Sequence, residues 1–260
     1  MKLFTATRAC CLLVLLILTP GLQAEQATVA AASSLRPTLD QMVEAFEEQH
    51  PEDSVVLIYG ASGRLTTQIL NGAPFDLFLS ANTEFPEQIA AAQAEASLPQ
   101  LYAGGQLALW SAKQDAREIG WEGLLSPDVR RIAIAQPDIA PYGQRAKEAL
   151  IHYGVWDQVQ GKLVYGESVS QTARMALSGA ADVAVIAASL VQQDIMKQQP
   201  YMPVDVSSHL PLSQSMVVTA KGSANPVAVA FSRFVMSDQG QSILAAAGFL
   251  PVANSGQQNN

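Results

Sequence analysis

The chain has 260 residues, with 15 basic and 23 acidic side chains and a formal net charge of −8. An acidic protein without a basic run does not suit the phosphate backbone of a nucleic acid, so we expect no nucleic-acid partner. Its overall field also repels anions, so an anionic ligand would have to be held by local dipoles.

The first 24 residues have the pattern of a cleaved secretory signal peptide. Lys2 and Arg8 supply a positive start, an apolar run covers residues 9–19, and Ala24 precedes the expected cleavage point. The apolar run is shorter than the roughly 20 residues that span a bilayer, which disfavours an uncleaved anchor. We therefore expect an exported protein that is located in the periplasm.

Cysteine usage narrows the chemistry of the exported chain. Cys10 and Cys11 are the only cysteines and both lie in the predicted signal peptide. The mature chain can then form no disulfide and carries no thiolate nucleophile or thiolate metal site. We also find no His, Asp or Glu grouping with metal-ligand spacing, and we expect no metal site and no cofactor.

In chain order, short apolar runs alternate with small-residue loops and amphipathic helical patterns. The apolar runs predict strands at residues 28–31, 55–59, 76–80, 107–110, 132–135, 163–165, 183–186 and 216–219. Helical patterns follow most of them, and Asn225-Pro226 is expected to cap a helix running towards Ser237. This alternation predicts an α/β fold with mostly parallel sheets.

An internal repeat predicts two lobes of similar build. Tyr59-Gly60-x-Ser62 recurs as Tyr165-Gly166-x-Ser168, and Asp76 recurs as Asp182, all at one offset of 106 residues. We predict a signal peptide at 1–24, a first lobe at 25–105 plus 214–260, and a second lobe at 106–213. Two crossover segments would form a hinge, and the ligand would bind in the cleft between the lobes.

Four segments stand where a predicted strand ends and a helix begins. They are residues 32–34, 61–63, 141–143 and 168–170. Each offers free backbone N–H groups and the positive end of a helix dipole, which suits an anion held by uncharged donors. Any one serine in these segments is more often a helix cap than a ligand, but four such segments at corresponding lobe positions favour a shared binding site.

Six sequence strings resemble the periplasmic molybdate-binding proteins of ABC importers, a family with a type II periplasmic binding protein fold. The strings are AAASSL (30–35), YGASGRL (59–65), GAPFDLFLSAN (72–82), APYG (140–143), WD (156–157) and YGESVSQT (165–172). They cover nearly the whole mature chain in order. The resemblance implies capture of molybdate or tungstate by a monomer that delivers it to a membrane permease.

The resemblance also implies the ligand-binding residues. Ser33, Ser34 and Ser62 would bind the anion from the first lobe, and the backbone N–H groups of Tyr142 and Val169 from the second. Some family members add a tyrosine hydroxyl after the following strand, where this chain has Ala187. That departure removes one donor, for which Ser33 or the Tyr142 side chain could compensate.

Charged residues near these segments are expected to have other roles. Arg36, Arg64 and Arg145 could each pair with an anion, but we predict that they lie on solvated helix faces. Asp76 and Asp182 are interpreted as turn and hinge residues, since a carboxylate would repel the anion.

Other functions remain to be weighed against molybdate binding. A serine hydrolase would need a base near Ser34 or Ser62, yet none of His50, His152 and His209 lies in a strand-to-helix segment. A binder of another oxyanion, such as sulfate, is the nearer alternative. A site made only of donors disfavours hydrogenphosphate, whose proton needs an acceptor, whereas molybdate, tungstate and sulfate carry no proton near neutral pH.

Overall fold

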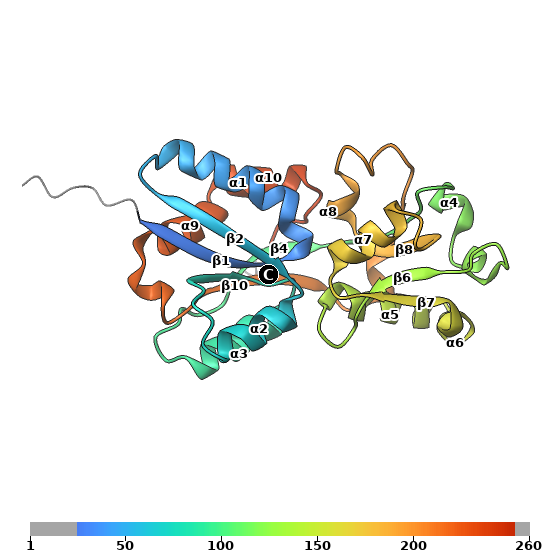
Figure 1. Cartoon of the computed structure of the whole chain (residues 1–260), viewed down its shortest axis with the longest axis horizontal. Coiled ribbons are helices and arrows are strands. Elements are labelled where there is room, and N and C mark those ends of the chain that lie inside the picture. The colour runs from blue at the N-terminus through green and yellow to red at the C-terminus, as the bar shows by residue number, and fades with distance from the viewer. Residues whose placement is uncertain (1–24, 253–260) are drawn as a thin grey trace, which may run out of the picture.

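The computed structural model describes residues 25–252, which form two α/β lobes side by side (Figure 1). The predicted signal peptide at residues 1–24 and the polar tail from Asn254 lie outside the described residues. Within the described part, no helix is both long enough and apolar enough to cross a bilayer.

Each lobe is built on one five-stranded mixed sheet. The first sheet has the order β2-β1-β3-β10-β4 and the second has the order β7-β6-β8-β5-β9. The strands of the first sheet are β1 (Gln26–Ala32), β2 (Ser54–Gly60), β3 (Leu77–Leu79), β4 (Gln100–Gly105) and β10 (Leu212–Val218). Those of the second are β5 (Leu107–Trp110), β6 (Ile132–Ala135), β7 (Leu163–Gly166), β8 (Val183–Ala187) and β9 (Met202–Pro203).

The two sheets share one topology. In each, three neighbouring strands run parallel, and the fourth strand, β10 or β5, runs antiparallel to both of its neighbours. The strands that carry the repeated Tyr-Gly pair, β2 and β7, are the corresponding edge strands, and the repeated aspartates directly precede β3 and β8. The 106-residue sequence repeat therefore reflects equivalent positions in two similar lobes.

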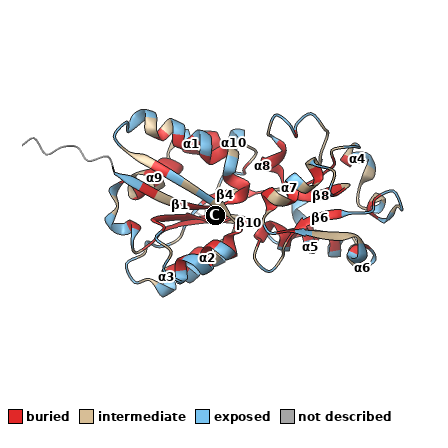
Figure 2. Cartoon of the chain, viewed as in Figure 1, coloured by how far each residue is buried: buried red, intermediate tan, exposed pale blue. Residues whose placement is uncertain are grey.

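Helices cover both faces of the first sheet (Figures 1 and 2). One face packs on α1 (Arg36–Gln49), α9 (Pro226–Met236) and α10 (Asp238–Ala246), and the other on α2 (Ser62–Leu70) and α3 (Glu84–Ala92). The second lobe carries α4 (Ala116–Ile119), α5 (Pro141–His152), α6 (Trp156–Val159), α7 (Val169–Leu177) and α8 (Ala188–Val191). Short 3-10 turns complete both lobes, of which η1 (Ser33–Leu35) leads from β1 into α1.

The chain crosses between the sheets twice. β4 ends at Gly105 in the first sheet and β5 begins at Leu107 in the second, so the first predicted boundary falls between two strands. On the return, β10 begins at Leu212, which pairs with Gly105, so the predicted boundary at 213/214 falls inside this strand. The register of β10 against β4 shifts between Gln214 and Ser215, which marks a β-bulge beside the crossover.

The segment at 141–143, predicted to stand where a helix begins, forms the start of α5. Helix α5 begins at Pro141, so Pro141, Tyr142 and Gly143 form its first turn. Proline is favoured there because its fixed φ suits the helix and its missing N–H would have no intrahelical partner. A Cβ on Gly143 would stand 2.1 Å from the Ala135 carbonyl oxygen, so only glycine lets α5 approach the end of β6 this closely.

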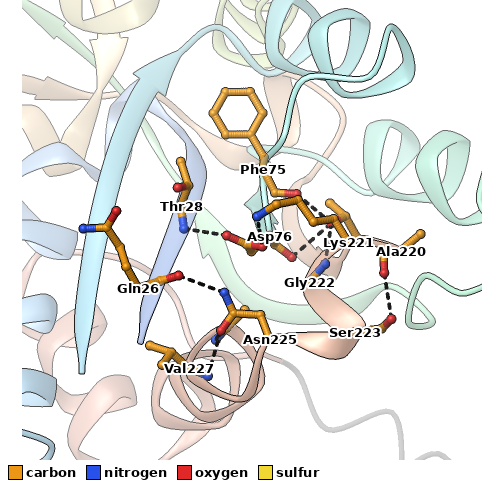
Figure 3. A network of polar contacts seen from close by, with 12 residues as sticks. Gln26, Thr28, Phe75, Asp76, Ala220, Lys221, Gly222, Ser223, Asn225 and Val227 are labelled. Atoms are coloured by element: carbon orange, nitrogen blue, oxygen red, sulfur yellow. Dashed lines mark hydrogen bonds and ion pairs between the residues drawn. The ribbon is translucent and has the colours of Figure 1, made fainter. Parts of the chain in front are cut away.

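At the amino ends of β1 and β3, a polar network joins the N-terminal part of the first lobe to the C-terminal segment that returns to it (Figure 3). The Asp76 carboxylate accepts the Thr28 N–H at 2.7 Å and pairs with Lys221. Thr219 donates to the Phe75 carbonyl at 2.7 Å, and Asn225 donates to the Gln26 carbonyl at 2.9 Å while capping α9.

The second lobe repeats this arrangement. Asp182 accepts the N–H groups of Arg130 and Arg131, both at 3.0 Å, and pairs with Lys113 at 3.4 Å. Partial burial opposes ionisation, yet these backbone and lysine contacts hold the pKa of Asp182 below its ordinary value. Both aspartates thus satisfy backbone donors at the start of a neighbouring strand, as expected of turn residues. Their recorded partners lie outside the two crossovers, so the structure does not support the interpretation of these aspartates as hinge residues.

Candidate oxyanion site between the lobes

One small cavity lies at the opposite, carboxyl ends of the parallel strands. The empty space there, together with the open solvent at its mouth, is about 200 Å³. The lining residues are Ala32, Ser33, Ser34, Gly60, Ala61, Ser62 and Ala81 from the first lobe and Ala140, Pro141, Tyr142 and Val169 from the second. All five residues predicted to bind the ligand are among them, although they are spread over 137 positions of the sequence. No charged side chain belongs to this lining.

Four helical segments point their first turns at this cavity: η1, α2, α5 and α7. Ser33, Ser62 and Val169 are the first residues of their segments and Tyr142 is the second of α5. N–H groups at these positions have no carbonyl partner inside their own helix. For the N–H groups of Ser62, Tyr142 and Val169, the structure between residues 25 and 252 records no hydrogen-bond acceptor.

The residue that precedes a helix decides whether the N–H groups of the second and third helical residues are capped, and the N–H of the first residue stays free in either case. Ala32, Ala61 and Ala140 occupy the N-cap positions of η1, α2 and α5, and none has a side-chain cap. Serine, threonine, aspartate and asparagine are the residues preferred there, because their side chains accept the free N–H groups. The interpretation of the serines as caps is therefore wrong for Ser33, Ser34 and Ser62, and right for Ser168, which caps α7 by accepting the Gln171 N–H.

The serine hydroxyls are oriented as donors by their own acceptor contacts. The Ser62 oxygen accepts the Ala81 N–H at 3.1 Å, and the Ser33 oxygen accepts the Ser170 N–H at 3.3 Å. A hydroxyl that already accepts such a bond has its proton left to donate. The Ser34 hydroxyl is fully buried and has no partner among the described residues, so it too is available at the cavity.

The Tyr142 side chain extends from the cavity towards the crossover strands. Its hydroxyl oxygen accepts from Gln214 Nε2 at 2.9 Å, and Gln214 accepts from the Tyr102 hydroxyl at 2.9 Å. Burial raises the pKa of the Tyr142 phenol, which therefore stays neutral. Gly105 makes room for this contact, because a Cβ there would lie 2.4 Å from the Tyr142 hydroxyl oxygen.

The three arginines considered near the site do not line the cavity. Arg64 forms an ion pair with Glu167 at 2.8 Å, and the guanidinium of Arg36 lies 4.1 Å from the centre of the Tyr59 ring. Both are exposed, as expected of solvated helix faces. Arg145 differs from the prediction, since it is 9% exposed and pairs with Glu148 at 2.6 Å.

Ala187 ends β8, is fully buried and is not part of the cavity lining. Two residues later, Ser189 in α8 donates to the Ser34 carbonyl at 2.9 Å. At this position the second lobe therefore contacts the segment that carries Ser34, and the contact is with the backbone.

Sequence reasoning missed the contributions of Ala61, Ala81 and Ala140. Ala61 and Ala140 could have been recognised as alanines at a helix start, where a capping residue is usual. Ala81 could have been recognised from its place in the Ser80-Ala81 pair that follows β3. The described residues hold no group of three or more His, Cys, Asp and Glu that could bind a metal ion.

Comparisons with known proteins agree with this geometry. Residues 27–250 match the family model described as bacterial extracellular solute-binding protein. The molybdate-binding protein ModA of Rhodobacter capsulatus is 31% identical over 232 residues, which cover 89% of this chain and 90% of that protein. The structure of the periplasmic molybdate-binding protein of Azotobacter vinelandii matches with a TM-score of 0.79 and 31% identity, covering 86% of this chain and 98% of that one.

A sulfate-binding protein also shares the fold. The protein SubI of Mycobacterium tuberculosis H37Rv matches with a TM-score of 0.71 at 19% identity, over 88% of each chain. At that identity the match concerns the fold alone. The predicted resemblance to the molybdate-binding family and the predicted two-lobed binding-protein fold are both confirmed by these matches.

Proposed function

Because this chain belongs to the family of bacterial extracellular solute-binding proteins, we propose that it captures molybdate, and also tungstate, between its two lobes. The observation that carries the proposal is the inter-lobe cavity lined by Ser33, Ser34, Ser62, Tyr142 and Val169, with uncapped helix starts and no charged side chain. The names of the relatives from Rhodobacter and Azotobacter support molybdate as the ligand.

Uncharged donors can hold a dianion in this acidic protein. Each helix start contributes about 0.3–1 kcal/mol when exposed and up to ~2 kcal/mol when partly buried. Hydrogen bonds to a charged group add about 1.5–3 kcal/mol each. Several such donors around one cavity therefore replace the ion pair that the site lacks.

The donor-only character of the site supports selectivity against hydrogenphosphate. Ser33 and Ser62 have their oxygens engaged by backbone N–H groups, which leaves their protons for the ligand. No carboxylate lines the cavity, so a proton on the ligand would find only hydroxyl oxygens as side-chain acceptors and would compete with the donors for them. Molybdate, tungstate and sulfate avoid this competition because they carry no proton near neutral pH.

Sulfate is the alternative ligand, because a sulfate-binding protein has the same fold. Sulfate has the same charge and shape as molybdate but is smaller, so the size of the closed cavity must separate them. A serine hydrolase has less support, because His50 and His152 lie at the ends of α1 and α5 and His209 lies in the second crossover, all outside the cavity lining.

The proposed mechanism is closure of the lobes around the anion. The ligand first binds one lobe, and the N–H groups of the other lobe then complete its coordination. Because the closed form binds the ligand better, the ligand shifts the population towards closure. We propose that the closed protein, as an exported periplasmic monomer cleaved near Ala24, delivers the anion to the membrane permease of an ABC importer.

Calorimetric titration of the purified mature protein with molybdate, tungstate, sulfate and phosphate tests the ligand. We expect tight binding of the first two and none of phosphate; tight binding of sulfate with no binding of molybdate would overturn the assignment. Ser62→Ala should weaken molybdate binding by roughly tenfold to a hundredfold, because it removes a hydrogen bond to a charged ligand. An unchanged affinity would remove Ser62 from the site.

A further inference from the structure

The segment that carries Ser33 and Ser34 is held from the opposite lobe. Ser170, in the first turn of α7, donates its hydroxyl to the Ser33 carbonyl at 2.7 Å and its N–H to the Ser33 hydroxyl at 3.3 Å. Ser189, in α8, donates its hydroxyl to the Ser34 carbonyl at 2.9 Å. Two helices of the second lobe thus contact two consecutive residues of the first.

These contacts are buried, and they do not belong to the cavity lining. Ser170 is 7% exposed and Ser189 is 4% exposed, whereas Ser33 and Ser34 line the cavity with their side chains. The same two residues therefore offer their hydroxyls to the ligand and their carbonyls to the second lobe. Anything that fixes those carbonyls also fixes where the two hydroxyls point.

From this geometry we infer that Ser170 and Ser189 are positioning residues that couple closure of the lobes to anion binding. The inference rests on the proposed function and adds two residues that do not touch the ligand. Their hydrogen bonds join the lobes and exist only when the lobes are closed, so they stabilise the closed form alone. Each bond raises the closed fraction and, with it, the apparent affinity.

The other inter-lobe contacts do not replace them. Gly63 donates its N–H to the Ile139 carbonyl at 2.9 Å, but a backbone pair of this kind is independent of the side chain. Arg64 and Glu167 form an ion pair across the lobes, and both are more than half exposed. Exposed ion pairs contribute little and are screened by salt.

Gln214 also donates to the Tyr142 hydroxyl across the lobes at 2.9 Å, but Tyr142 lines the cavity, so a change there would alter the site itself. Ser170 and Ser189 are buried side chains outside the lining, through which closure can be tuned separately.

The test is to compare Ser170→Ala and Ser189→Ala with wild type. We expect each to weaken molybdate binding by roughly tenfold, since closure then buries a carbonyl without its donor. The loss should appear in the dissociation rate, measured by stopped-flow tryptophan fluorescence, because the contacts form after the ligand has bound. The unfolding midpoint of the ligand-free protein should change little, because only its closed fraction has these bonds.

Ser178→Ala is the matched control, because Ser178 ends α7 and donates to the Met175 carbonyl within the same lobe. It should leave both rates of ligand exchange unchanged. If Ser170→Ala and Ser189→Ala lower the ligand-free unfolding midpoint and leave the dissociation rate at its wild-type value, the two serines stabilise one lobe and the inference is overturned.

A second measurement separates this inference from the choice of ligand. The predicted mature chain has no cysteine, so nitroxide labels can be placed at Glu87→Cys in the first lobe and Gln158→Cys in the second, both at exposed positions. Pulsed electron resonance then reports the inter-lobe distance without any ligand. If wild type binds none of the tested oxyanions, the proposed function fails; if the serine variants also leave the distance distribution unchanged, the closure role fails independently.

Discussion

Backbone N–H groups at the two ends of the parallel strands differ in whether the protein supplies them with an acceptor. At the amino ends, backbone N–H groups of Thr28, Arg130 and Arg131 are accepted by the carboxylates of Asp76 and Asp182. At the carboxyl ends, alanines precede three helical segments, and the first-turn N–H groups of Ser62 and Tyr142 have no acceptor in the described chain.

The hydrogen bonds at the amino ends stabilise the fold, whereas the free N–H groups at the carboxyl ends are available to a ligand. An N–H group that faces the protein gains from a carboxylate partner, and a buried donor without one costs about 1–3 kcal/mol. At the cavity end no group of the described chain accepts these N–H groups, so a ligand that supplies acceptors can bond to them directly. The missing caps are therefore as informative about function as the serines themselves.

The strongest way to break the contrast is to place an acceptor at the cavity end. Ala140→Asp puts a carboxylate at the N-cap of α5, where it can accept the N–H of Tyr142, as Asn225 accepts the Val227 N–H at the start of α9. We expect molybdate affinity to fall by more than about a hundredfold, because the carboxylate occupies the donors and repels the dianion. The free energy of unfolding of the ligand-free protein should rise by about 1 kcal/mol, the usual value of an N-cap, as measured by urea titration.

Asn225→Ala serves as the reverse control for that experiment. It removes a cap that accepts the N–H groups of Val227 and Ala228 away from the cavity. Stability should fall by about 1 kcal/mol while affinity stays the same. If both variants lost the same affinity, helix capping away from the cavity would also affect ligand binding, and the contrast between the two ends would fail.

The converse change is to remove the acceptor at the amino ends. Asp76→Ala leaves the buried Thr28 N–H without its partner and frees Lys221. We expect the free energy of unfolding to fall by about 2–3 kcal/mol, measured by urea titration. The affinity for molybdate of the folded variant, measured by calorimetry, should remain that of wild type; a large loss would show that Asp76 also acts on the site.

The smallest expected effect is a pH dependence from Asp182. Its pKa is lower in the folded protein than in the unfolded chain, so its stabilisation is complete above the ordinary aspartate value of about 3.9 and is lost as the pH falls through the lower, folded value. Unfolding curves measured between neutral and acidic pH should therefore have a shallower acid slope for Asp182→Asn. An unchanged slope would show that other carboxylates account for acid unfolding.

The α/β class and most strands could be predicted because their signals are local. The strands at 107–110 and 132–135 are apolar runs bounded by turn residues, and the structure reproduces both ranges. The predicted strand at 216–219 begins earlier, at Leu212, and Gln100–Gly105 was not predicted as a strand. Both segments lie at the crossover, where pairing between distant parts of the chain overrides the weak strand preference of Gly104 and Gly105.

The sequence by itself determined the residue types at the cavity: small, uncharged side chains before helices, in two sets that repeat at a spacing of 106. Those preferences act over a few residues, so they can be recognised without a fold. Only the tertiary structure decided that Ser33, Ser62, Tyr142 and Val169 face one cavity, and that Ala61 and Ala140 leave their helices uncapped there. It also decided the partners of Ser170 and Ser189, because contacts across 137 and 155 positions depend on how the two lobes pack.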